Sequence, residues 1–74
     1  MNIVERFSFD GRSYVVCSGP NITRRSKCDG FFANGKRYNA LGCEVRNSFS
    51  DHLQMLIEVE GTELPPIGTI TLLS

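Results

Sequence analysis

The strict alternation of side chains over residues 53–59 constrains the fold of this chain more than any other feature. Leu53, Met55, Ile57 and Val59 are apolar, and the residues between them include a glutamine and a glutamate. Successive side chains of a β-strand point to opposite faces, so this period of two places the apolar side chains on one face. The segment predicts a strand with one buried face, as in an antiparallel sheet that covers a small core.

Two dipeptides predict tight hairpin turns, because Asp10-Gly11 and Asn34-Gly35 accept the positive φ that both central positions of a type I′ turn require. The first turn joins residues 3–9 to the β-branched and aromatic residues 13–18. The second joins a short strand at residues 28–33 to a return that starts at residues 36–39. On the first strand, the residues expected to share one face are Ile3, Phe7 and Phe9.

The rest of the chain continues the same pattern. Leu41, Cys43 and Val45 alternate with more polar residues, so all three are expected on the buried face of a further strand. Gly19-Pro20 ends the preceding strand, because proline lacks the donor that a central strand needs. Residues 64–68 contain two adjacent prolines and predict a rigid crossing before a last strand that carries Ile70 and Leu72.

The length and composition predict one domain, residues 1–74. A chain of 74 residues is too short for two separate cores, and its 41% apolar content suffices for one. No window shows a sustained helical period. We expect an all-β fold: a small barrel of five to seven short, mainly antiparallel strands, since a flat sheet of this size leaves exposed edges.

Residues 41–73 resemble the second, β-barrel domain of translational GTPases such as elongation factor Tu. In that family, a strand runs into a glycine, a short polar stretch, a second glycine and a final apolar strand. Residues 53–59, Gly61, Gly68 and residues 69–73 follow that order, and residues 41–45 resemble the preceding strand. The GTPase domain itself has no counterpart here, so the resemblance implies a free-standing barrel that binds a partner and is not an enzyme.

Charge and targeting signals indicate a soluble, cytoplasmic protein. Eight basic and eight acidic residues cancel, which does not favour a dedicated nucleic-acid binder. The first residues carry no apolar signal-peptide core, and no stretch reaches the roughly 20 apolar residues that a membrane span needs. Leu56 and Leu73 are apolar residues on otherwise polar faces, so they either cover a barrel end or lie in a homo-oligomer contact.

Metal binding and catalysis have weak support in this sequence. Cys17, Cys28, Cys43 and His52 are the soft-metal ligands, but no Cys-x-x-Cys spacing is present. Cys17 and Cys43 fall on apolar strand positions and are expected to act as small hydrophobic residues. No third group orients His52 for a Cys-His nucleophile pair. We therefore expect no cofactor, no metal and no enzymatic activity.

A basic segment that contains two phenylalanines is the predicted binding site. Five of the eight basic residues lie between positions 24 and 37, with one acid among them. Cations beside aromatic rings on a β-sheet bind single-stranded nucleic acid, and the same cations suit an acidic protein surface. We expect a protein partner, with single-stranded RNA or DNA as the alternative. The residues are Arg24, Arg25, Lys27, Phe31, Phe32, Lys36 and Arg37.

Overall fold

The computed structural model describes residues 1–47 and 52–73 of the chain. These residues form six β-strands and no helix, and all paired strands are antiparallel. The predicted all-β class is therefore confirmed. The strands are β1 (Asn2–Phe9), β2 (Arg12–Ser18), β3 (Gly30–Ala33), β4 (Lys36–Asn47), β5 (Leu53–Val59) and β6 (Gly68–Leu73).

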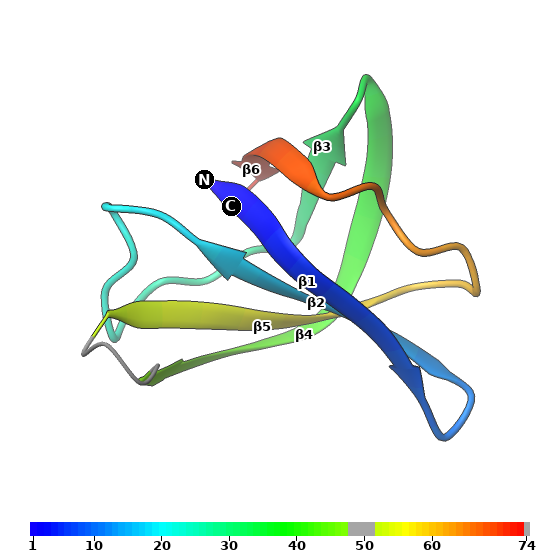
Figure 1. The fold of residues 1–74 in the computed structure, drawn as a ribbon, viewed down its shortest axis with the longest axis horizontal. Coiled ribbons are helices and arrows are strands. Elements are labelled where there is room, and N and C mark those ends of the chain that lie inside the picture. The colour runs from blue at the N-terminus through cyan, green and yellow to red at the C-terminus, as the bar shows by residue number, and fades with distance from the viewer. Residues whose placement is uncertain (48–51, 74) are drawn as a thin grey trace.

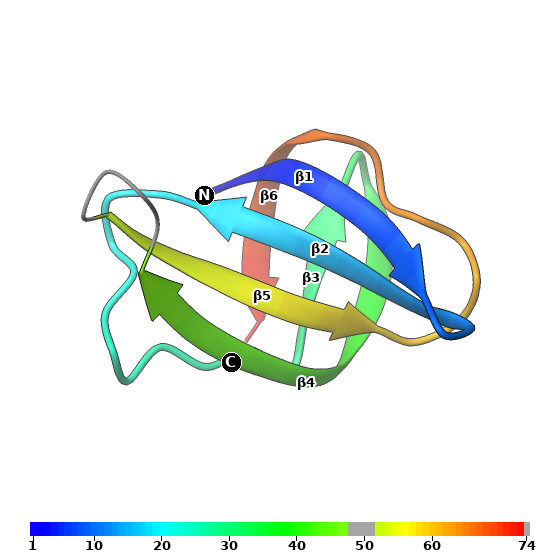
Figure 2. The same cartoon turned by 60° about the horizontal axis from the view of Figure 1, so that its bottom comes forward.

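The strands close into a barrel, as predicted, and their order around it is β1-β2-β5-β4-β3-β6 (Figures 1 and 2). The strand with the strict alternation, β5, lies between β2 and β4 and has the bounds predicted from the sequence. Closure between β1 and β6 rests on two residue pairs, Asn2 with Thr69 and Ile3 with Gly68. Beyond Ile3, β1 therefore pairs with β2 alone within the described residues.

Both predicted hairpin turns are present. Asp10 and Gly11 have φ of 53° and 74°, and Asn34 and Gly35 have φ of 52° and 78°. Positive φ at both central residues is the requirement of a type I′ turn, whose twist matches that of the flanking strands. The two turns set the register of β1 against β2 and of β3 against β4.

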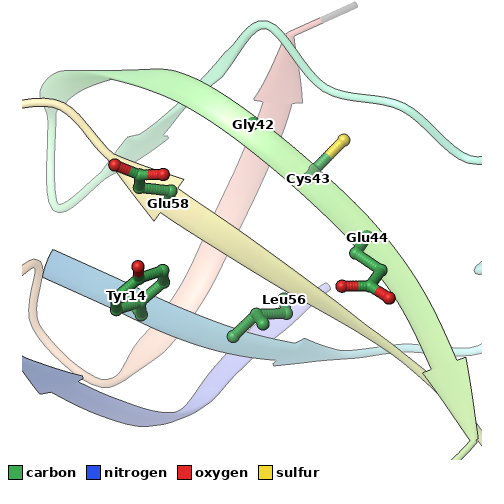
Figure 3. A pocket seen from close by; sticks show the side chains of 6 residues that line it. All are labelled: Tyr14, Gly42, Cys43, Glu44, Leu56 and Glu58. Carbon is green, nitrogen blue, oxygen red and sulfur yellow. The ribbon is translucent and has the colours of Figure 1, made fainter. Parts of the chain in front are cut away.

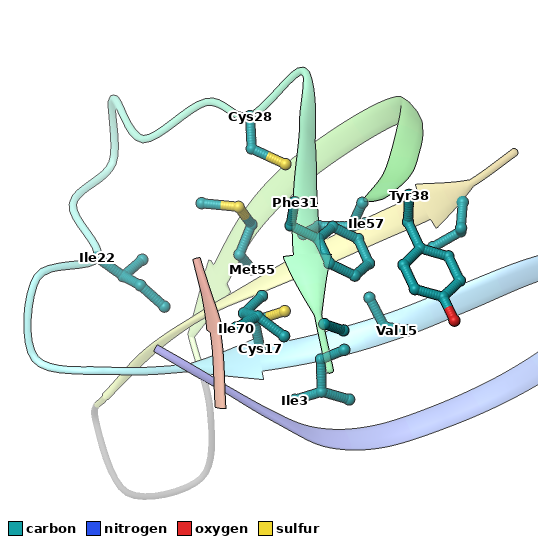
Figure 4. Close-up of a cluster of buried hydrophobic side chains, with 12 residues drawn as sticks. Ile3, Val15, Cys17, Ile22, Cys28, Phe31, Tyr38, Met55, Ile57 and Ile70 are labelled. Atoms are coloured by element: carbon teal, nitrogen blue, oxygen red, sulfur yellow. The ribbon is translucent and has the colours of Figure 1, made fainter. Parts of the chain in front are cut away.

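Side chains from all six strands fill the barrel (Figure 4). The ring of Phe31 on β3 is fully buried and stacks on Tyr38 of β4, with centroids 5.4 Å apart and planes inclined by 16°. The core also takes in two residues of the segment between β2 and β3. Its buried members are Ile3, Val15, Cys17, Ile22, Cys28, Phe31, Ala33, Tyr38, Met55, Ile57, Val59 and Ile70.

A bulge in β1 makes the predicted face of this strand wrong. Ile3 pairs with Cys17 and is buried, but the register shifts between Ile3 and Glu5, so Val4 is an extra residue. An extra residue in one strand moves every later side chain to the opposite face. Phe7 and Phe9 therefore point outward, with 36% and 70% of their surface exposed.

A second bulge, in β4, makes the prediction that Leu41 lies on the buried face wrong. The register with β5 shifts between Ala40 and Gly42, and Leu41 is 60% exposed. Ala40, Cys43 and Val45 pack against the core in its place. The two segments expected at residues 36–39 and 41–46 are one strand of 12 residues, because the chain bends at this bulge and continues without a break.

Candidate functional surface

One basic residue of the segment between β2 and β3, Arg24, contacts the end of β4. A tight turn holds this segment: the Ser26 amide donates to the Thr23 carbonyl at 3.0 Å, and the Thr23 amide donates to Ser26 Oγ at 2.8 Å. Arg24 follows and donates from Nη2 to the Asn47 side-chain oxygen at 2.7 Å. Arg25 and Lys27 are exposed. This part of the predicted site faces solvent.

The two phenylalanines of the predicted site point in opposite directions. Phe31 has no exposed surface, so its ring is a core side chain and does not lie on the predicted binding surface. Phe32 is 40% exposed on the outer side of β3, opposite Arg37 on β4 and Thr71 on β6. Because neighbours on a strand alternate between faces, one of the two had to be buried.

Lys36 is occupied by contacts within the chain. Its ammonium group pairs with the Glu63 carboxylate and lies 5.3 Å from the centroid of the Tyr38 ring. The hydrogen bond to Glu63 raises the pKa of Lys36 above its ordinary value. Lys36 thus connects the start of β4 to the segment between β5 and β6, on the exposed surface of the barrel.

The predicted basic residues do not form one surface. Arg24 contacts Asn47 at the last residue of β4, whereas Lys36 and Arg37 are its first two residues. The strand curves around the barrel between these ends (Figures 1 and 2). The basic residues therefore divide into a loop group and a hairpin group, with Phe32 beside the second.

Two of the three cysteines, Cys17 and Cys28, are core side chains in this fold. Cys17 and Cys28 are buried, and Cys43 is half-buried, with all three thiols free. Burial raises the pKa of Cys17 to about 12 and that of Cys28 to about 11, so both are protonated at neutral pH. Among residues 1–47 and 52–73, no group of three or more histidine, cysteine or acidic side chains is placed to hold a metal ion. His52 is exposed.

An apolar surface on the outside of the barrel was not predicted from the sequence. The register aligns Phe7, Tyr14, Glu58 and Gly42 in one row across β1, β2, β5 and β4. The adjacent row consists of Glu5, Val16, Leu56 and Glu44. Side chains in register on one face contact each other across the strands. We call the apolar members of these rows the outer patch: Phe7, Tyr14, Val16 and Leu56.

The side chains of the outer patch cover one another on the outside of the barrel. The rings of Phe7 and Tyr14 stack with centroids 5.2 Å apart and planes inclined by 18°. Val16 is only 2% exposed, although it does not belong to the cluster inside the barrel. An outward valine with so little exposure is covered by its neighbours on the same face. The patch is therefore a continuous apolar strip, with one ring at the β1 end.

A hollow adjoins the patch where Gly42 leaves the first row without a side chain (Figure 3). A Cβ added at Gly42 would meet no atom within 4 Å, which shows that the space is open. Tyr14 and Leu56 form its apolar side, and Glu44 and Glu58 its acidic side. Glu58 also faces Arg12, with Oε1 and Nη1 3.9 Å apart. The hollow is therefore apolar on one side and acidic on the other.

The sequence contains two signals for this surface. Residues 14–17 are four consecutive apolar or aromatic residues, a run that indicates a strand covered on both faces. Leu56 is the one apolar residue on the polar face of its strand. Phe7 gave no such signal, because its outward direction depends on the bulge at Val4.

Comparison with known proteins places the chain in no family. It matches no protein-family model, no curated protein and no solved structure. The similarity of residues 41–73 to the barrel domain of translational GTPases stays a prediction. Within the part of the chain that the structure describes, no helix has the length and apolar character to cross a membrane.

Proposed function

We propose that this chain is a non-enzymatic, cytoplasmic module that binds another protein through the outer patch. The observation that carries this proposal is the pair of cross-strand rows that gather Phe7, Tyr14, Val16 and Leu56 on the outside of the barrel. The interior is already filled by its own core, so these side chains are not needed to build it. Apolar strips with polar rims on small soluble domains are typical of protein-binding surfaces.

The charges around the patch define the partner's chemistry. Glu5 and Glu44 stand at the two ends of the second row, and Glu58 lies within the first. An apolar centre with an acidic rim complements a partner surface that combines apolar and basic side chains, since opposite charges at a rim favour encounter and orientation. This differs from the acidic partner expected for the basic segment.

Affinity capture tests this function with a matched pair of variants. The tagged chain is incubated with a lysate of the cells that express it, and bound proteins are quantified by mass spectrometry. Phe7→Ser should abolish capture of the specific partner, because it removes the exposed end of the patch. Phe32→Ser is the control, since Phe32 is 40% and Phe7 36% exposed, on different faces. Equal capture by both variants would contradict the assignment.

Binding of single-stranded nucleic acid is the second candidate, supported by the pairing of exposed Phe32 with Arg37. A ring beside a guanidinium can stack a base and neutralise its phosphate. Binding of a fluorescent oligonucleotide should then weaken steeply with salt. Arg24→Glu with Arg25→Glu should weaken it if the loop group takes part. No binding at low salt would eliminate this candidate.

A further inference from the structure

The β1 edge of the sheet is open over most of its length. β1 pairs with β6 only through Asn2 and Ile3, and all residues from Val4 to Phe9 are exposed. Figure 2 shows β1 as the outermost strand beside β2 and β5. An exposed edge strand presents backbone groups that can pair with another strand.

The hairpin register identifies which backbone groups face outward. Phe9 and Arg12 flank the two-residue turn and form a hydrogen-bonded pair. Hydrogen-bonded pairs alternate along an antiparallel ladder, so Phe7 also bonds to β2, whereas the amides and carbonyls of Arg6 and Ser8 point away from it. No backbone group of the described residues bonds to them.

Two features that usually protect an edge are present in β1, but neither blocks its outward backbone groups. Arg6 is an inward charged side chain, opposite Val15, and its guanidinium is held by the Pro65 carbonyl of its own chain at 2.9 Å. The other feature is a bulge, and the bulge of β1 lies at Val4, before this stretch. Residues 5–9 thus keep an uninterrupted register with β2 and can template a further strand.

We propose that the occupant of this edge is β1 of a second copy of the chain, paired antiparallel with its register centred on Phe7. Arg6 of each copy is then opposite Ser8 of the other, and their outward groups form about four backbone hydrogen bonds. Glu5 of each copy is opposite Phe9 of the other, so no like charges meet directly. A register centred on Arg6 would place two guanidinium groups opposite each other, which is destabilising.

The same register completes the aromatic row. The two Phe7 side chains become a direct cross-strand pair, and each ring is already stacked on its own Tyr14 at 5.2 Å. Facing aromatic residues stabilise antiparallel strand pairs. The outer patches of the two copies become one continuous surface. The dimer would thereby double the length of the surface that we propose for partner binding. In that respect alone the inference rests on the proposed function.

Sedimentation velocity over a range of protein concentrations tests the pairing. The mass should rise from monomer to dimer with concentration. Ser8→Pro removes the outward N–H without removing a bond to β2, and should hold the chain at the monomer mass. Ser8→Ala keeps the N–H and should dimerise as the wild type does. Circular dichroism of each variant confirms that the barrel is retained.

Cysteine cross-linking tests the register independently of the Ser8 variants. In the proposed dimer the Phe7 positions form a non-hydrogen-bonded pair with Cα atoms about 4.5 Å apart, which is within the range of a disulfide. Phe7→Cys should therefore give a covalent dimer under mild oxidation. Phe9→Cys, whose opposite residue is Glu5, should not. The wild-type chain, with its own three cysteines, provides the background.

A wild-type mass that stays monomeric at millimolar concentration would overturn the inference, and so would equal cross-linking at positions 7 and 9. In either case the edge belongs to a different occupant, such as an extended segment of another protein. If the dimer does not form, the capture experiment with Phe7→Ser and Phe32→Ser still tests partner binding by the monomer. The two proposals are therefore distinguishable.

Discussion

Phe7 and Tyr14 stack on the outer face of the barrel, with their ring centroids 5.2 Å apart and their planes inclined by 18°. The pair spans β1 and β2, and its Phe7 ring lies at the open edge of the sheet. The fold therefore has two aromatic pairs with different environments. Phe31 and Tyr38 stack inside the barrel, and Phe7 and Tyr14 stack where a partner can reach them.

Phe31 and Phe32 should respond very differently to truncation. Phe31→Ala removes a fully buried ring and should lower the free energy of unfolding by about 3–5 kcal/mol. Phe32→Ala removes a ring that is 40% exposed and should cost about 1 kcal/mol or less. Urea unfolding followed by circular dichroism measures both. Similar losses for the two variants would contradict the assigned faces.

Gly30 and Gly42 should also differ, although both lie in strands. A Cβ at Gly30 would come within 2.6 Å of the Tyr38 carbonyl oxygen, a backbone atom that cannot move away cheaply. A Cβ at Gly42 meets nothing within 4 Å. Gly30→Ala should lower the melting temperature clearly, whereas Gly42→Ala should leave it unchanged or raise it slightly. Thermal unfolding of the two variants makes the comparison. A harmless Gly30→Ala would show that β3 and β4 do not approach so closely.

The strands and turns were predictable from local sequence, and the faces of two strands were not. The alternation over Leu53–Val59 and the dipeptides Asp10-Gly11 and Asn34-Gly35 each express a local physical requirement, and the structure contains all three. The faces of Phe7 and Leu41 depend on bulges, where one strand holds an extra residue relative to its neighbour. A bulge is a property of a strand pair, so the period of one strand does not reveal it.

The candidate site, too, could not be predicted from local sequence alone. The basic segment is contiguous in sequence, yet β4 curves around the barrel and separates Arg24 from Lys36. The outer patch, in contrast, joins residues that are distant in sequence. Phe7 and Leu56 are far apart along the chain, and only the strand order places both beside β2. Sites assembled from strands across a barrel require the register as well as the composition.

Thiol reactivity should follow burial. At pH 8 the native chain should react quickly with a thiol reagent at Cys43, which is half-buried, and slowly at Cys17 and Cys28. Burial raises the pKa of the latter two to about 12 and 11, so almost no thiolate is present. Denaturant should expose all three thiols. The absorbance of the released reagent, followed over time, gives the number of thiols that have reacted. Rapid reaction of all three in the native state would refute the buried positions.

Stability should decline in alkaline solution because of the same thiols. The folded pKa of Cys17, about 12, lies above the ordinary value of 9.0. Below about pH 9 the thiol is protonated in both states, but between 9 and 12 the unfolded chain loses the proton first. Unfolding is thus favoured as pH rises through this window. Cys17→Ala should show a shallower decline between pH 9 and 11 in chemical unfolding experiments. Parallel declines for both proteins would exclude this cause.

Amide hydrogen exchange by NMR tests most directly the claim that two copies of the chain pair through their β1 edges, which joins their outer patches. The Phe7 and Phe9 amides bond to β2 and should exchange slowly at every protein concentration. The Arg6 and Ser8 amides point away from β2, so they should exchange quickly in dilute solution and slow markedly as the concentration rises. Exchange of Arg6 and Ser8 that does not change with concentration, or that matches Phe7 in dilute solution, would contradict the claim.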